Sequence, residues 1–278
     1  MIWLLYCAAA LAATALLYLF LMMPARATRE QRAIFERRTY AHRGLYDNEK
    51  GVPENSLAAF EAAMRAGYGC ELDVQFTSDK KLIVYHDNDF KRACGIDKKV
   101  WEMTFAEVRE LRLFATDEKV PTFEEVLEVV GGKEPLIVEV KAERLNKKWY
   151  DEVCEDTMKL LRGYKGEYCV ESFHPLAVRW FKKNAPEVVR GQLINGRKSS
   201  PSLNAAIGFF AENLCMDVLG RPQFIAYKEQ DRNFALRLAQ KLGAFTVMWT
   251  VRSMERQKQL EKKENAIIFE KYLPAKRY

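Results

Sequence analysis

Two apolar, strand-like runs of this sequence are interrupted by charged residues at a spacing of two. Glu71 and Asp73 lie in one run, and Glu139 and Lys141 lie in another. Side chains two residues apart on a strand point to the same face of a sheet, so each pair is expected to be presented together. The three carboxylates offer the hard oxygen ligands that Mg²⁺ or Ca²⁺ prefers, with coordination positions left for water and phosphate.

The chain has only three histidines, and each follows a strand-like run. His42 precedes Arg43, His86 opens a His-Asp pair, and His174 follows a Glu-Ser-Phe run. Imidazoles suit proton transfer near neutral pH, while Arg43 and Lys141 can hold phosphate oxygens. With the carboxylates, this set suits metal-dependent phosphoryl transfer. An ion-paired structural cluster is the alternative interpretation of the same residues, and a structural role is the simpler interpretation of His174.

These residues form one site only if their strands belong to one sheet. Eight strand-like segments alternate with helix-like ones, at 39–42, 70–76, 136–141, 168–173, 188–194, 224–227, 245–251 and 266–269. This alternation predicts an α/β fold, and a domain of this length suits a (β/α)₈ TIM barrel, in which the carboxyl ends of the strands meet. A doubly wound sheet is the alternative, but no glycine-rich nucleotide-binding loop follows any strand.

The connections between the strands are expected to be mainly helical, at 56–66, 122–130, 147–161, 175–184, 202–212, 231–242 and 253–261. The second connection is different. An additional run, 82–86, is expected to pair with 70–76 as a hairpin, and 87–121 is expected to be an irregular insertion with a helix near 105–111.

The charge distribution argues against a nucleic-acid binder. Lys and Arg total 44 against 38 Asp and Glu, but the excess lies in the stretch 24–41 and in the last eight residues. The segment 42–270 is electrically balanced and therefore lacks the basic surface that phosphate backbones require. The six cysteines form no C-x-x-C pair and are expected to be ordinary thiols.

The N-terminal end has the composition of a membrane anchor. Residues 2–23 form a run of 22 residues without a charge, which as a helix spans roughly 33 Å, enough for a bilayer core of roughly 30 Å. A cleaved signal peptide is the competing interpretation, because Ala25-Arg26-Ala27 resembles a cleavage site. The arginines lie after the apolar run, which favours an uncleaved single-pass anchor with a cytoplasmic domain. We therefore expect an anchor (1–23), a basic juxtamembrane stem (24–38) that is helical over 28–38, and a barrel (39–278).

Several motifs, in order, resemble those of the glycerophosphodiester phosphodiesterases. They are His42-Arg43-Gly44, Pro53-Glu54-Asn55-Ser56, Glu71-Leu72-Asp73-Val74-Gln75-Phe76-Thr77, Val84-Tyr85-His86-Asp87, Val120-Pro121-Thr122-Phe123-Glu124-Glu125, Ile137-Val138-Glu139-Val140-Lys141, Ser172-Phe173-His174-Pro175 and Trp249-Thr250-Val251. The resemblance covers about 39–270. It implies a TIM barrel with a small insertion after the second strand. It also implies one divalent cation, Mg²⁺ or Ca²⁺, and hydrolysis of glycerophosphodiesters to glycerol 3-phosphate and an alcohol.

The resemblance also implies a role for each matching residue. Metal ligands are expected at Glu71, Asp73 and Glu139, general acid–base groups at His42 and His86, and phosphate contacts at Arg43, Lys141 and Glu54. Glu54 would contact substrate or order the site by hydrogen bonding. Phe173 and Trp249 are expected either to form an apolar wall for the glycerol carbons or to belong to the barrel core.

The sequence departs from the family pattern at two positions. Lys80-Lys81 stands where the family often has a glycine turn, and Phe269-Glu270 stands where a Thr-Asp pair is expected, which leaves the rim of the last strand undefined.

Two other functions compete with hydrolysis of glycerophosphodiesters. The anchored domain would alternatively hydrolyse membrane lysophospholipids as a lysophospholipase D. A non-catalytic, membrane-tethered phosphodiester-binding barrel is the remaining alternative.

Overall fold

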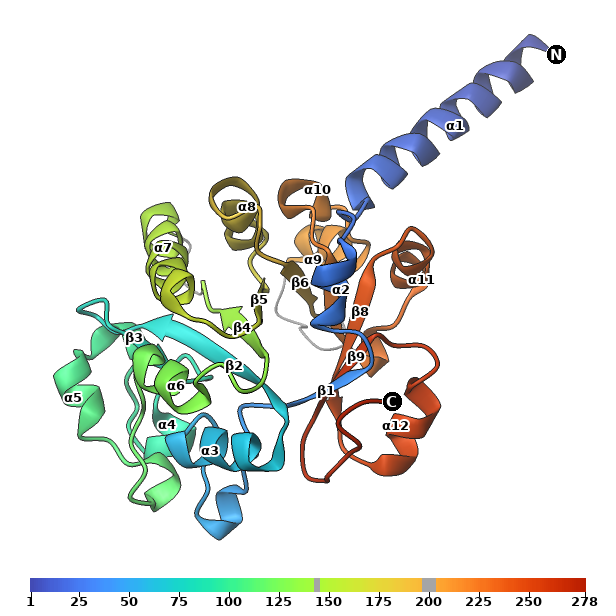
Figure 1. Cartoon of the computed structure of the whole chain (residues 1–278). Helices are drawn as coiled ribbons and strands as arrows, with labels where there is room; N and C mark the ends of the chain where they lie inside the picture. The colour runs from blue at the N-terminus through green and yellow to red at the C-terminus, as the bar shows by residue number, and fades with distance from the viewer. Residues whose placement is uncertain (143–145, 197–203) are drawn as a thin grey trace.

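Eight parallel strands form a closed barrel in the computed structural model, which describes residues 1–142, 146–196 and 204–278 (Figure 1). The barrel strands are β1 (Arg38–Ala41), β2 (Gly69–Phe76), β4 (Leu136–Val140), β5 (Tyr168–Ser172), β6 (Arg190–Ile194), β7 (Phe224–Lys228), β8 (Phe245–Val251) and β9 (Ala266–Phe269). Each strand pairs with the next in this order, and β1 closes the ring by pairing with both β9 and β2. The predicted (β/α)₈ TIM barrel is confirmed, and the doubly wound alternative is excluded.

Helices connect most of the strands and cover the outside of the barrel. They are α3 (Leu57–Ala66), α6 (Phe123–Val130), α7 (Lys147–Gly163), α8 (Pro175–Asn184), α9 (Ala205–Glu212), α10 (Asp217–Gly220), α11 (Phe234–Lys241) and α12 (Met254–Leu260). Several begin at a residue whose side chain accepts a hydrogen bond from a free helix amide, among them Ser56, Thr122 and Ser253. The helix expected at 231–242 begins later, at Phe234, because Asn233 caps it. Residues 202 and 203 of the helix expected at 202–212 lie outside the described residues.

The insertion after β2 is present as expected. It begins with the antiparallel strand β3 (Leu82–Val84) and contains α4 (Lys91–Cys94), α5 (Phe105–Arg109) and the 3₁₀ turns Val100–Glu102 and Leu113–Ala115. Lys80 lies in the turn before β3 with φ +61°, the left-handed region that favours glycine. The lysine at this family glycine position therefore keeps the glycine backbone conformation.

The juxtamembrane stem differs from the helix expected at 28–38. Only Arg29–Ala33 is helical (α2), and Phe35 is fully buried at the amino end of the barrel. Its ring lies 4.7 Å from that of Phe224 and 6.2 Å from that of Phe245, the first residues of β7 and β8. Sequence periodicity missed this contact because its partners lie roughly two hundred residues further along the chain. The end of the expected stem therefore closes the bottom of the barrel.

The N-terminal helix α1 (Ile2–Met22) projects away from the barrel and is long and apolar enough to cross a membrane (Figure 1). Its C-terminal end, from Tyr18 onward, packs on the barrel, where Met22 is fully buried. The Arg221 guanidinium donates hydrogen bonds to the carbonyls of Phe20 (2.6 Å) and Met23 (2.9 Å). Because Arg221 lies between α10 and β7, the helix joins the barrel at its side, near the amino ends of the strands.

Candidate active site

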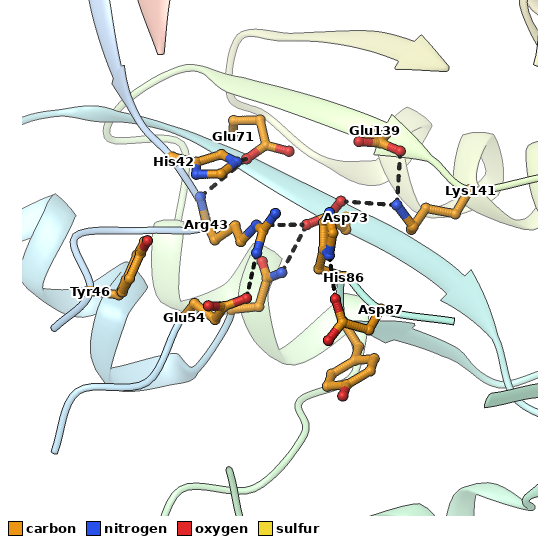
Figure 2. Close-up of polar contacts among 12 residues, drawn as sticks. His42, Arg43, Tyr46, Glu54, Glu71, Asp73, His86, Asp87, Glu139 and Lys141 are labelled. Atoms are coloured by element: carbon orange, nitrogen blue, oxygen red, sulfur yellow. Dashed lines mark hydrogen bonds and ion pairs between the residues drawn. The ribbon is translucent and has the colours of Figure 1, made fainter. Parts of the chain in front are cut away.

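Strand register brings the predicted carboxylates together inside the barrel. Asp73 of β2 pairs with Glu139 of β4, and Glu71 precedes Asp73 by two residues, so all three point inward. All three side chains are buried, and one oxygen from each lies within 4.8 Å of those of the other two (Figure 2). The arrangement has the donor type and spacing of a site for one hard divalent cation.

A tight turn after β1 positions the first predicted motif. Arg43 has a left-handed backbone (φ +55°), and its amide donates to the Glu71 carboxylate at 3.1 Å. A side chain on Gly44 (φ +79°) would bring its Cβ within 2.9 Å of the Ala59 backbone. Glycine is therefore required for the turn to pack against α3, which in turn presents His42 and Arg43 at the carboxyl end of β1.

The two predicted phosphate-binding cations both reach the carboxylates. The Lys141 ammonium lies 3.0 Å from Glu139 and 3.5 Å from Asp73, and Arg43 Nε lies 3.8 Å from Asp73. Figure 2 shows Arg43 and Lys141 on opposite sides of Asp73. A phosphate oxygen bound at the cation site would therefore meet one positive charge from each side.

The Glu54 carboxylate binds two arginine side chains. Its carboxylate accepts hydrogen bonds from Arg43 (2.5 Å) and Arg92 (2.7 and 3.0 Å), and from the Asn48 amide at 3.2 Å. Burial opposes ionisation of Glu54, but these partners lower its pKa to about 2. The carboxylate is therefore anionic at neutral pH and holds Arg43 in place, which favours the ordering role over direct substrate contact.

Both predicted acid–base histidines have a carboxylate behind the ring. His42 Nδ1 lies 2.7 Å from Glu270, and His86 Nδ1 lies 2.6 Å from Asp87. When each Nδ1–H donates to its carboxylate, Nε2 remains the nitrogen available for proton exchange. Nε2 of His42 lies 3.9 Å from the Glu71 carboxylate, so this ring is next to the cation site. The second imidazole, His86, follows β3 and lies beside Asp73 (Figure 2).

Each of these carboxylates is held in turn by an arginine. Glu270 accepts from Arg252 Nε at 2.6 Å and from the Tyr46 hydroxyl at 2.9 Å. Asp87 accepts from Arg92 Nε at 2.7 Å. Burial opposes ionisation of both acids, but the hydrogen bonds from the histidines and arginines hold their pKa values well below the ordinary range. Two carboxylate-backed imidazoles therefore flank the cluster.

The electrostatics of the cluster fit a bound cation. Burial, followed by repulsion from Asp73 and Glu139, raises the pKa of Glu71 well above its ordinary value, and burial also raises the pKa of Glu139. Burial would likewise raise the pKa of Asp73, but His86, Lys141 and Arg43 hold it far below the ordinary range. More carboxylate charge is thus concentrated here than the neighbouring cations offset, and a divalent ion would relieve the repulsion.

Glu171 is a fourth carboxylate that sequence reasoning did not assign to the site. It pairs in register with Glu139, is 2% exposed, and has one carboxylate oxygen without a hydrogen-bond partner among the described residues. Burial, and then the charges of Glu139 and Asp73, raise its pKa well above the ordinary value. The available signal was one glutamate inside the otherwise uncharged run of β5, which lacks the second charge two residues away that marks Glu71-Asp73 and Glu139-Lys141.

The remaining predicted residues, Phe173, Trp249 and His174, lie at or just beyond the carboxyl ends of β5 and β8. Phe173 and Trp249 are half-buried and pack edge to face, with ring centroids 5.9 Å apart. The wall and the core both stay predictions for this pair. Their exposed edges make them available to apolar parts of a ligand. The ring of His174 lies 5.0 Å from that of Tyr150 of α7, and His174 precedes α8 at the N-cap position, where its side chain makes no capping hydrogen bond. The structural interpretation of His174 stays a prediction.

The structure also identifies contacts that sequence reasoning missed. Asn55 donates to Asp73 at 2.9 Å, and Arg92 comes from the insertion. The motif around Glu54 contained Asn55, so a signal existed for it. For Arg92, Tyr46 and Arg252 the sequence offered no signal. The rim of β9, left undefined by the unusual Phe269-Glu270 pair, contributes Glu270 directly to the site.

Glu270 is expected to position His42, and Glu270→Gln tests this role. The carboxylate accepts from three donors, which an amide NH₂ group cannot do, so kcat is expected to fall about 10- to 100-fold. Because the carboxylate raises the pKa of His42 against the lowering effects of burial and Arg43, its loss should shift the His42 limb of the pH–rate profile to lower pH. Glu270→Asp should restore part of the rate. An unchanged pH profile with lower thermal stability would indicate a purely structural role.

A closed (β/α)₈ barrel with three clustered carboxylates and two imidazoles at the carboxyl ends of its strands has the arrangement of barrel enzymes, whose active sites lie at this end. The family model of the glycerophosphoryl diester phosphodiesterases matches residues 42–270. The chain belongs to this family.

Individual relatives agree with this assignment. A glycerophosphodiester phosphodiesterase of Caldanaerobacter subterraneus is 36% identical over 164 residues, which cover 55% of this chain and 65% of that protein. One from Bacillus altitudinis is 30% identical over 158 residues, covering 54% and 63%. The chain thus spans slightly less than two thirds of these relatives. The structure of an Oleispira antarctica phosphodiesterase in complex with sn-glycerol-3-phosphate shares the fold, with a TM-score of 0.68 at 19% identity over 86% of this chain and 94% of that one.

Proposed function

We propose that this protein hydrolyses glycerophosphodiesters to glycerol 3-phosphate and an alcohol, with one divalent cation, Mg²⁺ or Ca²⁺. The observation that carries the proposal is the convergence, in one buried cluster, of three carboxylates, two carboxylate-backed imidazoles and two cations. Glu71, Asp73 and Glu139 would hold the cation, which when bound would stabilise negative charge on the phosphate.

The protein residues supply the other requirements of the reaction. Arg43 and Lys141 would orient the phosphodiester and offset its charge, which otherwise repels an incoming nucleophile. One of His42 and His86 would take a proton from the nucleophile, and the other would donate a proton to the leaving alkoxide at its oxygen. Phe173 and Trp249 would contact the glycerol carbons at the mouth.

The test is product analysis on glycerophosphocholine. Purified full-length protein should release glycerol 3-phosphate and choline, lose this activity in excess chelator, and recover it when Mg²⁺ or Ca²⁺ is restored. Glu61→Gln, an exposed change on α3, is a matched control that should retain activity. Binding of substrate without turnover under any of these conditions would instead support the non-catalytic barrel.

A second candidate is hydrolysis of lysophospholipids, as by a lysophospholipase D. One observation favours it: an open cavity of about 780 Å³, which begins at Glu139 and Lys141 and continues between apolar side chains that include Leu193, Ile207 and Leu219. Such a channel would accept an alkyl chain. Comparison of kcat/KM for glycerophosphocholine and a lysophosphatidylcholine separates the two substrates.

We further propose that α1 is an uncleaved single-pass anchor and that the barrel lies in the cytoplasm. The support is the uncharged helix, long enough for a bilayer, followed by five arginines within 26–38. In this organisation residues 1–23 cross the membrane, residues 24–38 lead into the barrel, and 39–278 carry the site.

A further inference from the structure

The base of α1 is fixed to the barrel by contacts over more than one helical turn. Besides its hydrogen bonds to Phe20 and Met23, Arg221 stacks its guanidinium on the Phe20 ring at 4.7 Å. The amide of Ala25 donates to the Pro222 carbonyl at 3.0 Å. These contacts give α1 a defined exit from the side of the barrel, beside α10 (Figure 1).

A second contact, one turn closer to the N-terminus of α1, shows how near the end of α9 lies to the proposed membrane surface. The Tyr18 hydroxyl donates to the carbonyl of Asn213, the residue that follows α9, at 3.3 Å. Tyr18 lies four residues before the end of α1, or about 6 Å along the helix axis. Because the whole of α1 is needed to cross a bilayer core of roughly 30 Å, the end of α9 must lie near the level at which α1 enters the bilayer.

Large apolar side chains are exposed at this level. Ile207 (52% exposed), Phe209 (51%) and Phe210 (49%) all lie on α9. Phe234 (66% exposed) begins α11, next to α9, because Asn233 donates to the Glu212 carbonyl at 2.7 Å. Outside the N-terminal segment, no other large exposed hydrophobic residues in the described chain gather in this way; an apolar group of this kind marks an interaction surface.

Positive charge lies on the elements beside the apolar group. Leu219 of α10 lines one cavity with Ile207 of α9, and the carbonyl of Leu219 accepts a hydrogen bond from Lys182 of α8 at 3.2 Å. Burial and the nearby cations Arg221, Arg190, Arg179 and Lys183 lower the pKa of Lys182. Within the described parts of the chain, no ion pair joins Arg179, Lys182, Lys183 or Arg221 to a carboxylate. Basic and aromatic side chains together match the headgroup region of an anionic bilayer.

We propose that a second surface of the barrel lies on the bilayer that α1 crosses. This surface consists of Ile207, Phe209, Phe210 and Phe234 and the basic residues that border them. The barrel would then contact the membrane at two places, α1 and this surface. This inference rests on the proposed anchoring by α1. Continuity with the base of α1, and the charge complementarity to anionic headgroups, identify the occupant as the membrane rather than a protein.

The test measures quenching of thiol-linked fluorophores by nitroxide-labelled lipids, with the full-length protein in phosphatidylcholine–phosphatidylglycerol vesicles. Three labelling positions are compared: native Cys7 in α1, Phe209→Cys on α9, and Ile96→Cys as the matched control. Ile96 is 37% exposed and follows α4, which lies across the barrel from α1 (Figure 1). Cys94 and Cys215 are changed to Ser throughout, and Cys7 to Ala in the latter two; the remaining cysteines are buried. Hydrolysis of soluble substrate confirms that each labelled protein is folded.

Lipid quenching at position 209 should be within about two-fold of that at Cys7, should increase with the fraction of anionic lipid, and should be absent at position 96. Quenching at Cys7 without quenching at 209 would leave the anchor in place and overturn the second contact. Protection of position 209 from aqueous iodide without lipid quenching would assign the surface to a protein partner or a second copy, and would also overturn it. Absence of quenching at both positions would remove the anchoring and this proposal together, while phosphodiesterase activity is read separately.

Discussion

Asp73→Asn, Glu71→Gln and Glu139→Gln are each expected to lower kcat by about 10³-fold or more and to weaken Mg²⁺ and Ca²⁺ binding. The amides keep the shape of the site but lose the charge that holds a hard cation, whose stabilisation of the transition state is worth several kcal/mol at about 1.4 kcal/mol per tenfold in rate. Turnover after chelation and metal re-addition measures the first effect. The rise in Tm on adding millimolar cation measures the second, independently of activity.

The electrostatics of the cluster distinguish this effect from misfolding. Because burial and neighbouring carboxylates raise the folded-state pKa of Glu71, its ionised form is disfavoured by folding at neutral pH. Glu71→Gln should therefore leave the Tm of the metal-free protein unchanged or higher, while abolishing the cation-dependent increase. Exposed Glu61→Gln should preserve the increase. If all three site variants retained wild-type turnover after metal re-addition, the assignment of these ligands would be wrong.

His42→Ala and His86→Ala are each expected to lower kcat about 10²- to 10⁴-fold, with fold and cation binding retained, since each removes a positioned acid–base group. The double variant should lose less than the product of the single losses, because both groups act in one constellation. His174→Ala is the matched control. Its ring lies against Tyr150, so its loss should change Tm or KM more than kcat.

Leaving-group dependence separates the two imidazoles. A p-nitrophenyl ester departs without protonation, so the variant that lacks the general acid should regain rate on this substrate, and the variant that lacks the base should not. The comparison is made as the ratio of kcat on the p-nitrophenyl and alkyl esters. An equal response of both variants, or a greater loss from His174→Ala than from either, would contradict the assignment of roles.

The barrel and most of the cluster could be predicted from sequence because both depend on short-range patterns. Each barrel strand is a short apolar run, and the charged residues that interrupt β2 and β4 are brought to one level by parallel pairing. The motif His42-Arg43-Gly44 carries its own turn, since the glycine is required by contact with Ala59. These features depend on residues close together in the chain, so they can be recognised before the fold is known.

The residues that were missed depend on contacts between distant segments. Glu270 reaches His42 only because β9 closes the barrel beside β1, and Arg92 reaches Glu54 only because the insertion folds over the mouth. The burial of Phe35 has the same origin, since its partners begin β7 and β8. None of these pairings produces a periodic pattern in the chain. They become visible only when the barrel is closed.

The buried position of Phe35 limits where the proposed anchor could be cut from the barrel without loss of the packing at the amino end. Proteolysis after Arg38 would remove the aromatic ring that fills the amino end and leave Phe224 and Phe245 facing solvent. Cleavage after Ala27 would keep α2, including the Thr28 cap, together with Phe35. A cut that leaves the barrel with both α2 and Phe35 therefore falls before Thr28.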